Sequence, residues 1–277
     1  MRVRPLIAGL LYLAAAVAAQ GQFLAEAAPG SLEAGYRAMY NLQFDEAHEV
    51  FQGWERSHPD DALGPVSDAA AYLFSEFDRL HVLETELFID DNKFESRSKL
   101  APDPKAKQAF ESELSKGQQI ADKALARDGK NPDALFAQVM ILGLRADYAA
   151  LVEKRDLAGL NYMKTGRTMA ERLLASNPTY YDAYLAVGVE NYLLSLRSAP
   201  MRLLLRITGA QTDKEAGLQK LRITAEKGHY LLPYARLLLA VAALRDKQRE
   251  QARSILEDLS RHFPRNRLYA RELAKLQ

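Results

Sequence analysis

The sequence contains no cysteine among its 277 residues. This absence excludes disulfides, thiolate metal ligands, iron–sulfur clusters and a cysteine nucleophile. Tryptophan occurs only once, at Trp54. Neither sign of charge dominates, because 37 lysines and arginines stand against 36 aspartates and glutamates, without a block of like charges. A nucleic-acid partner is therefore not expected.

Long apolar runs are scarce, and the one at the amino terminus is short. Arg2 and Arg4 precede the apolar segment 6–17, and Ala16-Val17-Ala18 offers a small-x-small cleavage pattern. The run is shorter than the roughly 20 residues that a spanning helix needs. The pattern predicts a cleaved signal peptide over 1–19, a flexible lead-in over 20–30, and export to the periplasm or extracellular space. An uncleaved membrane anchor is the alternative.

The stretch 31–59 has the pattern of two short helices folded into a hairpin. Gly35 allows close helix approach, Ala47 and Phe51 face back toward the first helix, and Pro59 ends the second. Such a hairpin cannot bury its own apolar face and must stack on a neighbour. Trp54 occupies a position where the repeat pattern prefers a small side chain, so the next element must leave a wider gap.

The rest of the chain is also expected to be helical. A long apolar stripe predicts a helix over 66–88, which completes an amino-terminal unit over 31–89 and fills the gap at Trp54. A polar loop over 90–104 separates this unit from helical repeats over 105–277, which include a helix at 249–262. Ala252 to Pro264 repeats the spacing of Ala47 to Pro59. The predicted fold is all-α, with antiparallel hairpins stacked as an irregular α-solenoid.

An insert at 195–212 interrupts the repeat period. It starts a short helix at Pro200, alternates leucine with arginine, and stops at Gly209. One interpretation is that it docks inside the fold. The other is that it contacts a membrane surface or a partner. The residues assigned to that contact are Arg202, Leu203, Leu204 and Arg206.

Two stretches carry a resemblance to a known family: GYRAMYNLQFDEAHEVF (35–51) and GVENYLLSLRSAPMRLLLRITGAQTDKEAGLQKL (188–221). With them, the chain resembles a divergent tetratricopeptide repeat protein. More narrowly, it is similar to the family of inclusion-body-clearance and mitochondrial-outer-membrane tetratricopeptide proteins. The second stretch has that family's order of apolar helix, proline-started Leu/Arg helix, glycine loop and helix. The region 90–165 departs from it. The resemblance implies a helical repeat scaffold without known catalysis.

Chemistry-bearing residues are sparse. His81 and Glu84 are neighbours on a helix face and, with Asp90 or Asp91, could in principle hold a divalent ion, but a surface hydrogen bond or solvated charge is the favoured interpretation of the pair. The sequence has no nucleophile elbow, phosphate loop or dinucleotide fingerprint. No catalytic, cofactor or metal residue is therefore assigned, and a metal-dependent hydrolase is only the second alternative.

The candidate partner site is the concave face of the solenoid, lined by first helices of the hairpins. Apolar and aromatic side chains fall at these positions, which suits either a packed core or a groove for an apolar helix or peptide. The expected function is an exported protein-interaction scaffold, and the first alternative is a membrane-associated assembly factor that uses the insert. The assigned groove residues are Tyr36, Met39, Tyr40, Phe136, Met140, Leu185, Val189, Tyr192, Tyr234 and Leu237.

Overall fold

The structure, a computed structural model, describes residues 27–84, 89, 96, 98–196, 201–203, 207 and 209–276. Across these residues it contains helices and no strand, so the predicted all-α, solenoid-like architecture is confirmed. The predicted signal peptide, 1–19, lies outside the described residues. The helices are α1 (Leu32–Tyr40), α2 (Phe44–Ser57), α3 (Leu63–Arg79), α6 (Pro104–Arg127), α7 (Pro132–Asp147), η1 (Tyr148–Val152), α8 (Asp156–Ser176), η2 (Tyr181–Ala183), α9 (Tyr184–Ser195), α11 (Lys214–Lys227), α12 (Leu232–Arg245), α13 (Arg249–His262) and α14 (Arg267–Ala274).

Several helices start where the sequence supplies a cap. A side-chain oxygen just before the helix accepts a hydrogen bond from an amide of the first turn, which would otherwise lack a partner. Proline follows the cap in α6 and α7, where its missing N–H costs nothing. The capping residues are Ser31, Asp103, Asn131, Asp213 and Asn266.

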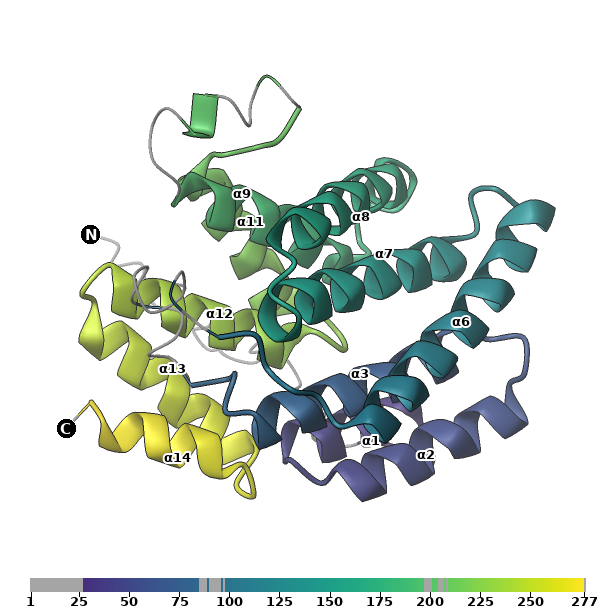
Figure 1. Ribbon diagram of the computed structural model, residues 1–277, viewed down its shortest axis with the longest axis horizontal. Helices are drawn as coiled ribbons and strands as arrows, with labels where there is room; N and C mark the ends of the chain where they lie inside the picture. The colour runs from purple at the N-terminus through teal and green to yellow at the C-terminus, as the bar shows by residue number, and fades with distance from the viewer. Residues whose placement is uncertain are drawn as a thin grey trace, which may run out of the picture.

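Within the described residues the helices pair in sequence as α1–α2, α3–α6, α7–α8, α9–α11 and α12–α13 (Figure 1). The second helix of every pair carries a small, buried residue about three turns before its C-cap. At Gly217 the reason is close backbone approach, because an added Cβ would lie 2.6 Å from the Tyr192 amide nitrogen. The small residues are Ala47, Gly117, Gly166, Gly217 and Ala252, and the matching C-caps are His58, Asp128, Asn177, Gly228 and Phe263.

The first and last pairs also share their turn. Leu42 and Lys247 adopt left-handed backbone conformations, with φ of 60° and 61°. In each turn the next amide, from Gln43 or Gln248, reaches back to a carbonyl of the preceding helix's last turn. This is the Schellman geometry. The predicted correspondence between Ala47–Pro59 and Ala252–Pro264 thus extends to the hairpin turns.

The helix after the first pair is shorter than expected. The sequence predicts 66–88, whereas α3 ends at Arg79 because His81 takes a left-handed conformation, with φ of 57°. The Val82 amide closes the turn on the Phe77 carbonyl at 2.9 Å, and its side chain is buried. Most of 85–97 lies outside the described residues. Trp54 lies against the first turn of α3, as predicted. Its ring is so close to Gly64 that a Cβ added there would be 3.3 Å from the Trp54 Cδ1 atom.

The chain runs round so that its last elements lie beside its first (Figure 1). The Asn266 side-chain amide donates to the Tyr40 carbonyl at 2.8 Å, and the Arg265 amide donates to the Asn41 side chain at 3.1 Å. An ion pair of 2.7 Å joins Arg267 to Asp78. These contacts join the last helical segment to α1 and α3. The concave side of the helix stack therefore faces the interior of the molecule.

Among the described residues, one helical stretch, Pro132–Val152, is long and apolar enough to cross a membrane by length and composition. It consists of α7 and the π-helical turn η1. Core helices of soluble proteins meet the same criterion, and 67% of this window is buried within the fold.

Candidate functional site

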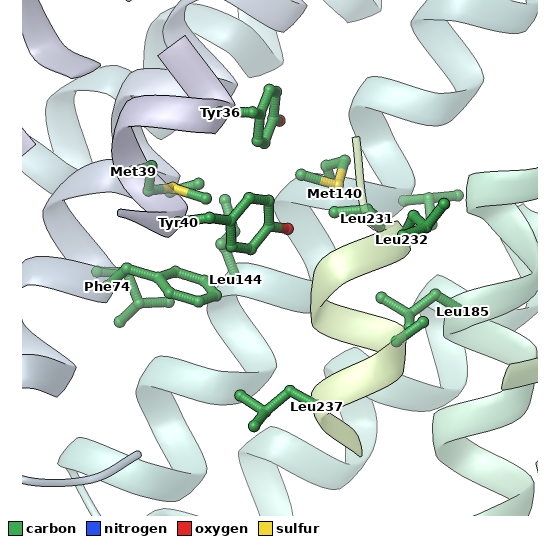
Figure 2. Close-up of a cluster of buried hydrophobic side chains, with 14 of the residues drawn as sticks. Tyr36, Met39, Tyr40, Phe74, Met140, Leu144, Leu185, Leu231, Leu232 and Leu237 are labelled. Atoms are coloured by element: carbon green, nitrogen blue, oxygen red, sulfur yellow. The ribbon is translucent and has the colours of Figure 1, made fainter. Parts of the chain in front are cut away.

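The predicted groove residues lie in the interior of the molecule. All but Val189 and Tyr234 are buried, with Tyr36 and Met39 each 1% exposed and Phe136 fully enclosed. Val189 and Tyr234 are partly buried against the same cluster. Figure 2 shows side chains from α1, α3, α7 and α12 converging on a shared core. The structure therefore brings the predicted set together as packing.

Aromatic contacts between the amino-terminal helices α1 and α3 and the start of α12 fill this interior. The Tyr36 ring stacks on Tyr230 with 4.8 Å between centroids, and Tyr40 Oη donates to the Tyr230 carbonyl at 3.0 Å. Phe74 meets Tyr234 edge to face at 5.5 Å. Because these side chains already occupy the concave side, a partner peptide cannot reach it without opening the molecule.

The apolar side chains described in the insert are exposed, unlike those of the predicted groove. Leu203 is 63% exposed and Ile207 is 77% exposed, and Met201 is also exposed. The described residues 201–203 lie beyond α9 in Figure 1. Of the other assigned insert residues, Arg202 folds back, with Nη1 donating to the Ser195 carbonyl at 3.4 Å. The residues Leu204 and Arg206 lie outside the described residues. We call the exposed residues Met201, Leu203 and Ile207 the apolar tip.

A largely buried polar network holds the backbone at Gly209, where the chain leaves the apolar tip. Glu190, on α9, is fully buried, and its Oε2 accepts from Arg167 Nε at 2.8 Å. The same guanidinium donates to Glu171 at 2.6 Å and to the Gly209 carbonyl at 3.1 Å. Burial raises the pKa of Glu190, although the Arg167 charge opposes that rise. The network therefore fixes Gly209, where φ of 81° turns the chain back toward α11.

The segment after Gly209 is tied to the same helices. Gln211 donates from its backbone to Glu190 at 3.2 Å and from its side chain to Glu171 at 2.7 Å. Its side-chain oxygen accepts from Asn191 at 2.6 Å, and Asn191 accepts from the Asp213 amide at 3.3 Å. These bonds hold residues 209–213, which follow the apolar tip, against α8 and α9, whereas the side chains of the tip are exposed.

Possible metal ligands come together at the predicted pair and, elsewhere in the described part of the chain, in a cluster of three carboxylates. The predicted pair His81 and Glu84 lies 3.4 Å apart on the surface, and Asp90 and Asp91 are outside the described residues. The second place, which the sequence did not predict, joins Glu55, Asp68 and Glu113 from three helices, with ligand oxygens within 4.8 Å of one another. Sequence spacing reveals the polar face of each helix but not which helices face each other.

The sequence matches no known protein-family model and no curated protein.

Proposed function

We propose that the chain is a non-catalytic interaction scaffold of the tetratricopeptide type, in which the apolar tip contacts a protein partner. The recurring small residue in each second helix supports the repeat assignment, because repeat hairpins need that close approach where their helices cross. The filled interior argues against a peptide groove. A partner can still bind to an outer segment such as the apolar tip. The Arg167–Glu190 network immobilises Gly209, where the chain returns from the tip to the helices.

The observation that carries this proposal is the exposure of Leu203 and Ile207. Large aliphatic side chains gain about 1.5 to 3 kcal/mol each on complete burial. Since Leu203 is 63% and Ile207 is 77% exposed, the pair would supply about 2 to 4 kcal/mol to a complex, which suits the anchor of a transient interface. The fixed backbone at Gly209 lowers the ordering cost of such an anchor.

A membrane surface is the second candidate for the apolar tip. Arg202 precedes Leu203 in the sequence, and arginine next to exposed aliphatic residues suits an interface with anionic lipid once its contact with the Ser195 carbonyl opens. The few exposed apolar side chains of the tip alone bind lipid weakly, so this role would need a second attachment. An uncleaved 1–19 segment would provide one.

The test uses the double variant Leu203→Asp/Ile207→Asp, with Leu157→Asp as control because Leu157 is an 84% exposed leucine outside the tip, on α8. Both variants should unfold at the wild-type temperature. Partner capture from the envelope fraction should be lost only in the double variant. Flotation with phosphatidylglycerol-containing liposomes separates the candidates, since wild-type flotation that the double variant loses would favour lipid. Capture that is equal in all three proteins would refute the role of the tip.

Export is part of the same proposal, and it depends on 1–19. Mass spectrometry of the protein from its native host should give a mature chain that starts near residue 20. An intact Met1 in a membrane-associated fraction would instead favour the anchor.

A further inference from the structure

Three carboxylates converge between the first and second hairpins. Glu55 comes from α2, Asp68 from α3 and Glu113 from α6, and each offers an oxygen within 4.8 Å of the others. The side chain of Asp68 is 1% exposed, that of Glu113 is 11% exposed, and that of Glu55 is 19% exposed. Like charges at this separation repel strongly where water is largely excluded.

Two of the carboxylate oxygens have no hydrogen-bond partner among the described residues. They are Glu55 Oε1 and Glu113 Oε2, and both atoms are buried. Glu113 as a residue is only 9% exposed. Buried acceptors of this kind carry a desolvation cost unless a proton, a donor or a cation satisfies them.

The basic side chains beside the cluster contact only part of it. Lys116 Nζ contacts Glu113 at 2.5 Å and Glu55 at 3.8 Å, but its side chain is 52% exposed. His48 Nδ1 lies 2.5 Å from Asp68 Oδ1. Neither contact reaches the two free oxygens, Glu55 Oε1 and Glu113 Oε2, which stay without a hydrogen-bond partner beside these groups in the described part of the chain.

We propose that Glu55, Asp68 and Glu113 form a binding site for a hard divalent cation, with Ca²⁺ as the best match. Carboxylate oxygens are the ligands that Ca²⁺, Mg²⁺ and Mn²⁺ prefer, and Ca²⁺ tolerates irregular sets completed by water. A cavity of about 350 Å³, lined by Gln52, Glu55, Arg56, Glu113 and Lys116, gives water and the ion access.

The neighbouring side chains suit this role. His48 and Gln52 both hydrogen-bond Asp68, at 2.5 and 3.3 Å, and so orient a buried ligand in the way that outer-shell partners do. The half-exposed Lys116 swings outward when the ion enters. Since the ligands come from α2, α3 and α6, the bound ion joins the first hairpin to the second and stabilises their interface.

The first measurement is thermal unfolding of the purified full chain with Ca²⁺, Mg²⁺ or Mn²⁺ after chelator treatment, with calorimetric titration of Ca²⁺. At an ion concentration about 100 times the Kd, the unfolding temperature should rise by about 5 °C. Absence of both heat and a temperature shift for all three ions would overturn the proposal.

Variants then locate the site. Glu113→Gln should weaken Ca²⁺ binding by about tenfold or more, whereas Glu111→Gln, at a 61% exposed position on the same helix, should leave it unchanged. Lys116→Ala should bind Ca²⁺ at least as tightly as the wild type, because the competing ammonium is gone. Weaker binding in Lys116→Ala, or equal losses in both glutamine variants, would refute the assigned ligands. If Glu113→Gln does not fold, Glu55→Gln replaces it with the same expected loss.

Discussion

Asp182 is the residue whose removal should most weaken the joint between the fourth and fifth hairpins. It lies in η2, before α9, and is 4% exposed. Its Oδ1 accepts from the amides of His229 and Leu231 at 2.9 and 3.0 Å, and its Oδ2 accepts from those of His229 and Tyr230 at 3.0 and 3.1 Å. One carboxylate thus satisfies the backbone that leads into α12.

The expected cost of Asp182→Ala follows from these bonds. Hydrogen bonds to a charged group contribute about 1.5 to 3 kcal/mol each, but water replaces part of that at the exposed His229. The Leu231 amide is buried and would stay unsatisfied. We expect a loss of about 3 to 5 kcal/mol in the free energy of unfolding. Asp182→Asn keeps one acceptor oxygen and should lose about half as much.

Urea unfolding followed by circular dichroism measures these differences. The matched control is Asp60→Asn, since Asp60 is an exposed loop aspartate and should change the unfolding free energy by less than about 0.5 kcal/mol. Hydrogen exchange at residues 229–231 should accelerate in Asp182→Ala. A loss below about 1 kcal/mol, with unchanged exchange, would refute the reasoning.

Further predictions concern close packing and a buried carboxyl group. Gly217→Ala should destabilise the fold by about 1 to 3 kcal/mol, because its Cβ would lie 2.6 Å from the Tyr192 amide nitrogen. Gly143→Ala has open space around the added Cβ and should stabilise α7 by up to about 1 kcal/mol. Thermal unfolding of the two variants compares these effects, and equal changes in unfolding temperature would contradict the close contact at Gly217. Burial raises the pKa of Asp147 to about 7, opposed only by the Tyr234 hydroxyl at 3.4 Å. The folded state therefore holds this proton more tightly than the unfolded state, so its contribution to stability should fall as pH rises from about 4 to 7. Asp147→Asn should flatten that part of the stability profile, and an unchanged profile would contradict the assignment.

Much of the fold was predictable because local signals agreed. The helix predicted over 249–262 matches α13 residue for residue, since its apolar spacing and Pro264 mark the end. The end of α3 was not predictable in this way. No glycine or proline marks it, and His81 takes a left-handed conformation that closure on the buried Val82 stabilises. Tertiary packing decided that boundary.

The candidate sites were less accessible to sequence reasoning. Apolar first-helix residues such as Tyr36 suit a groove and a core equally, and only the long-range contact with Tyr230 distinguishes them. The carboxylates of Glu55, Asp68 and Glu113 lie on separate helices, so no spacing within one segment could reveal their convergence. Exposure of Leu203, by contrast, agrees with the alternative in which the insert contacts a partner or membrane.

Site-specific photo-crosslinking tests the central claim most directly. A benzophenone amino acid would replace Leu203 in the apolar tip, Leu157 on α8, or Met140 in the interior. We expect one discrete protein adduct from position 203 that Ile207→Asp abolishes, none from 157, and only intramolecular products from 140. A partner adduct from position 140, or equal adducts from 157 and 203, would contradict a scaffold that is closed inside and binds through its tip.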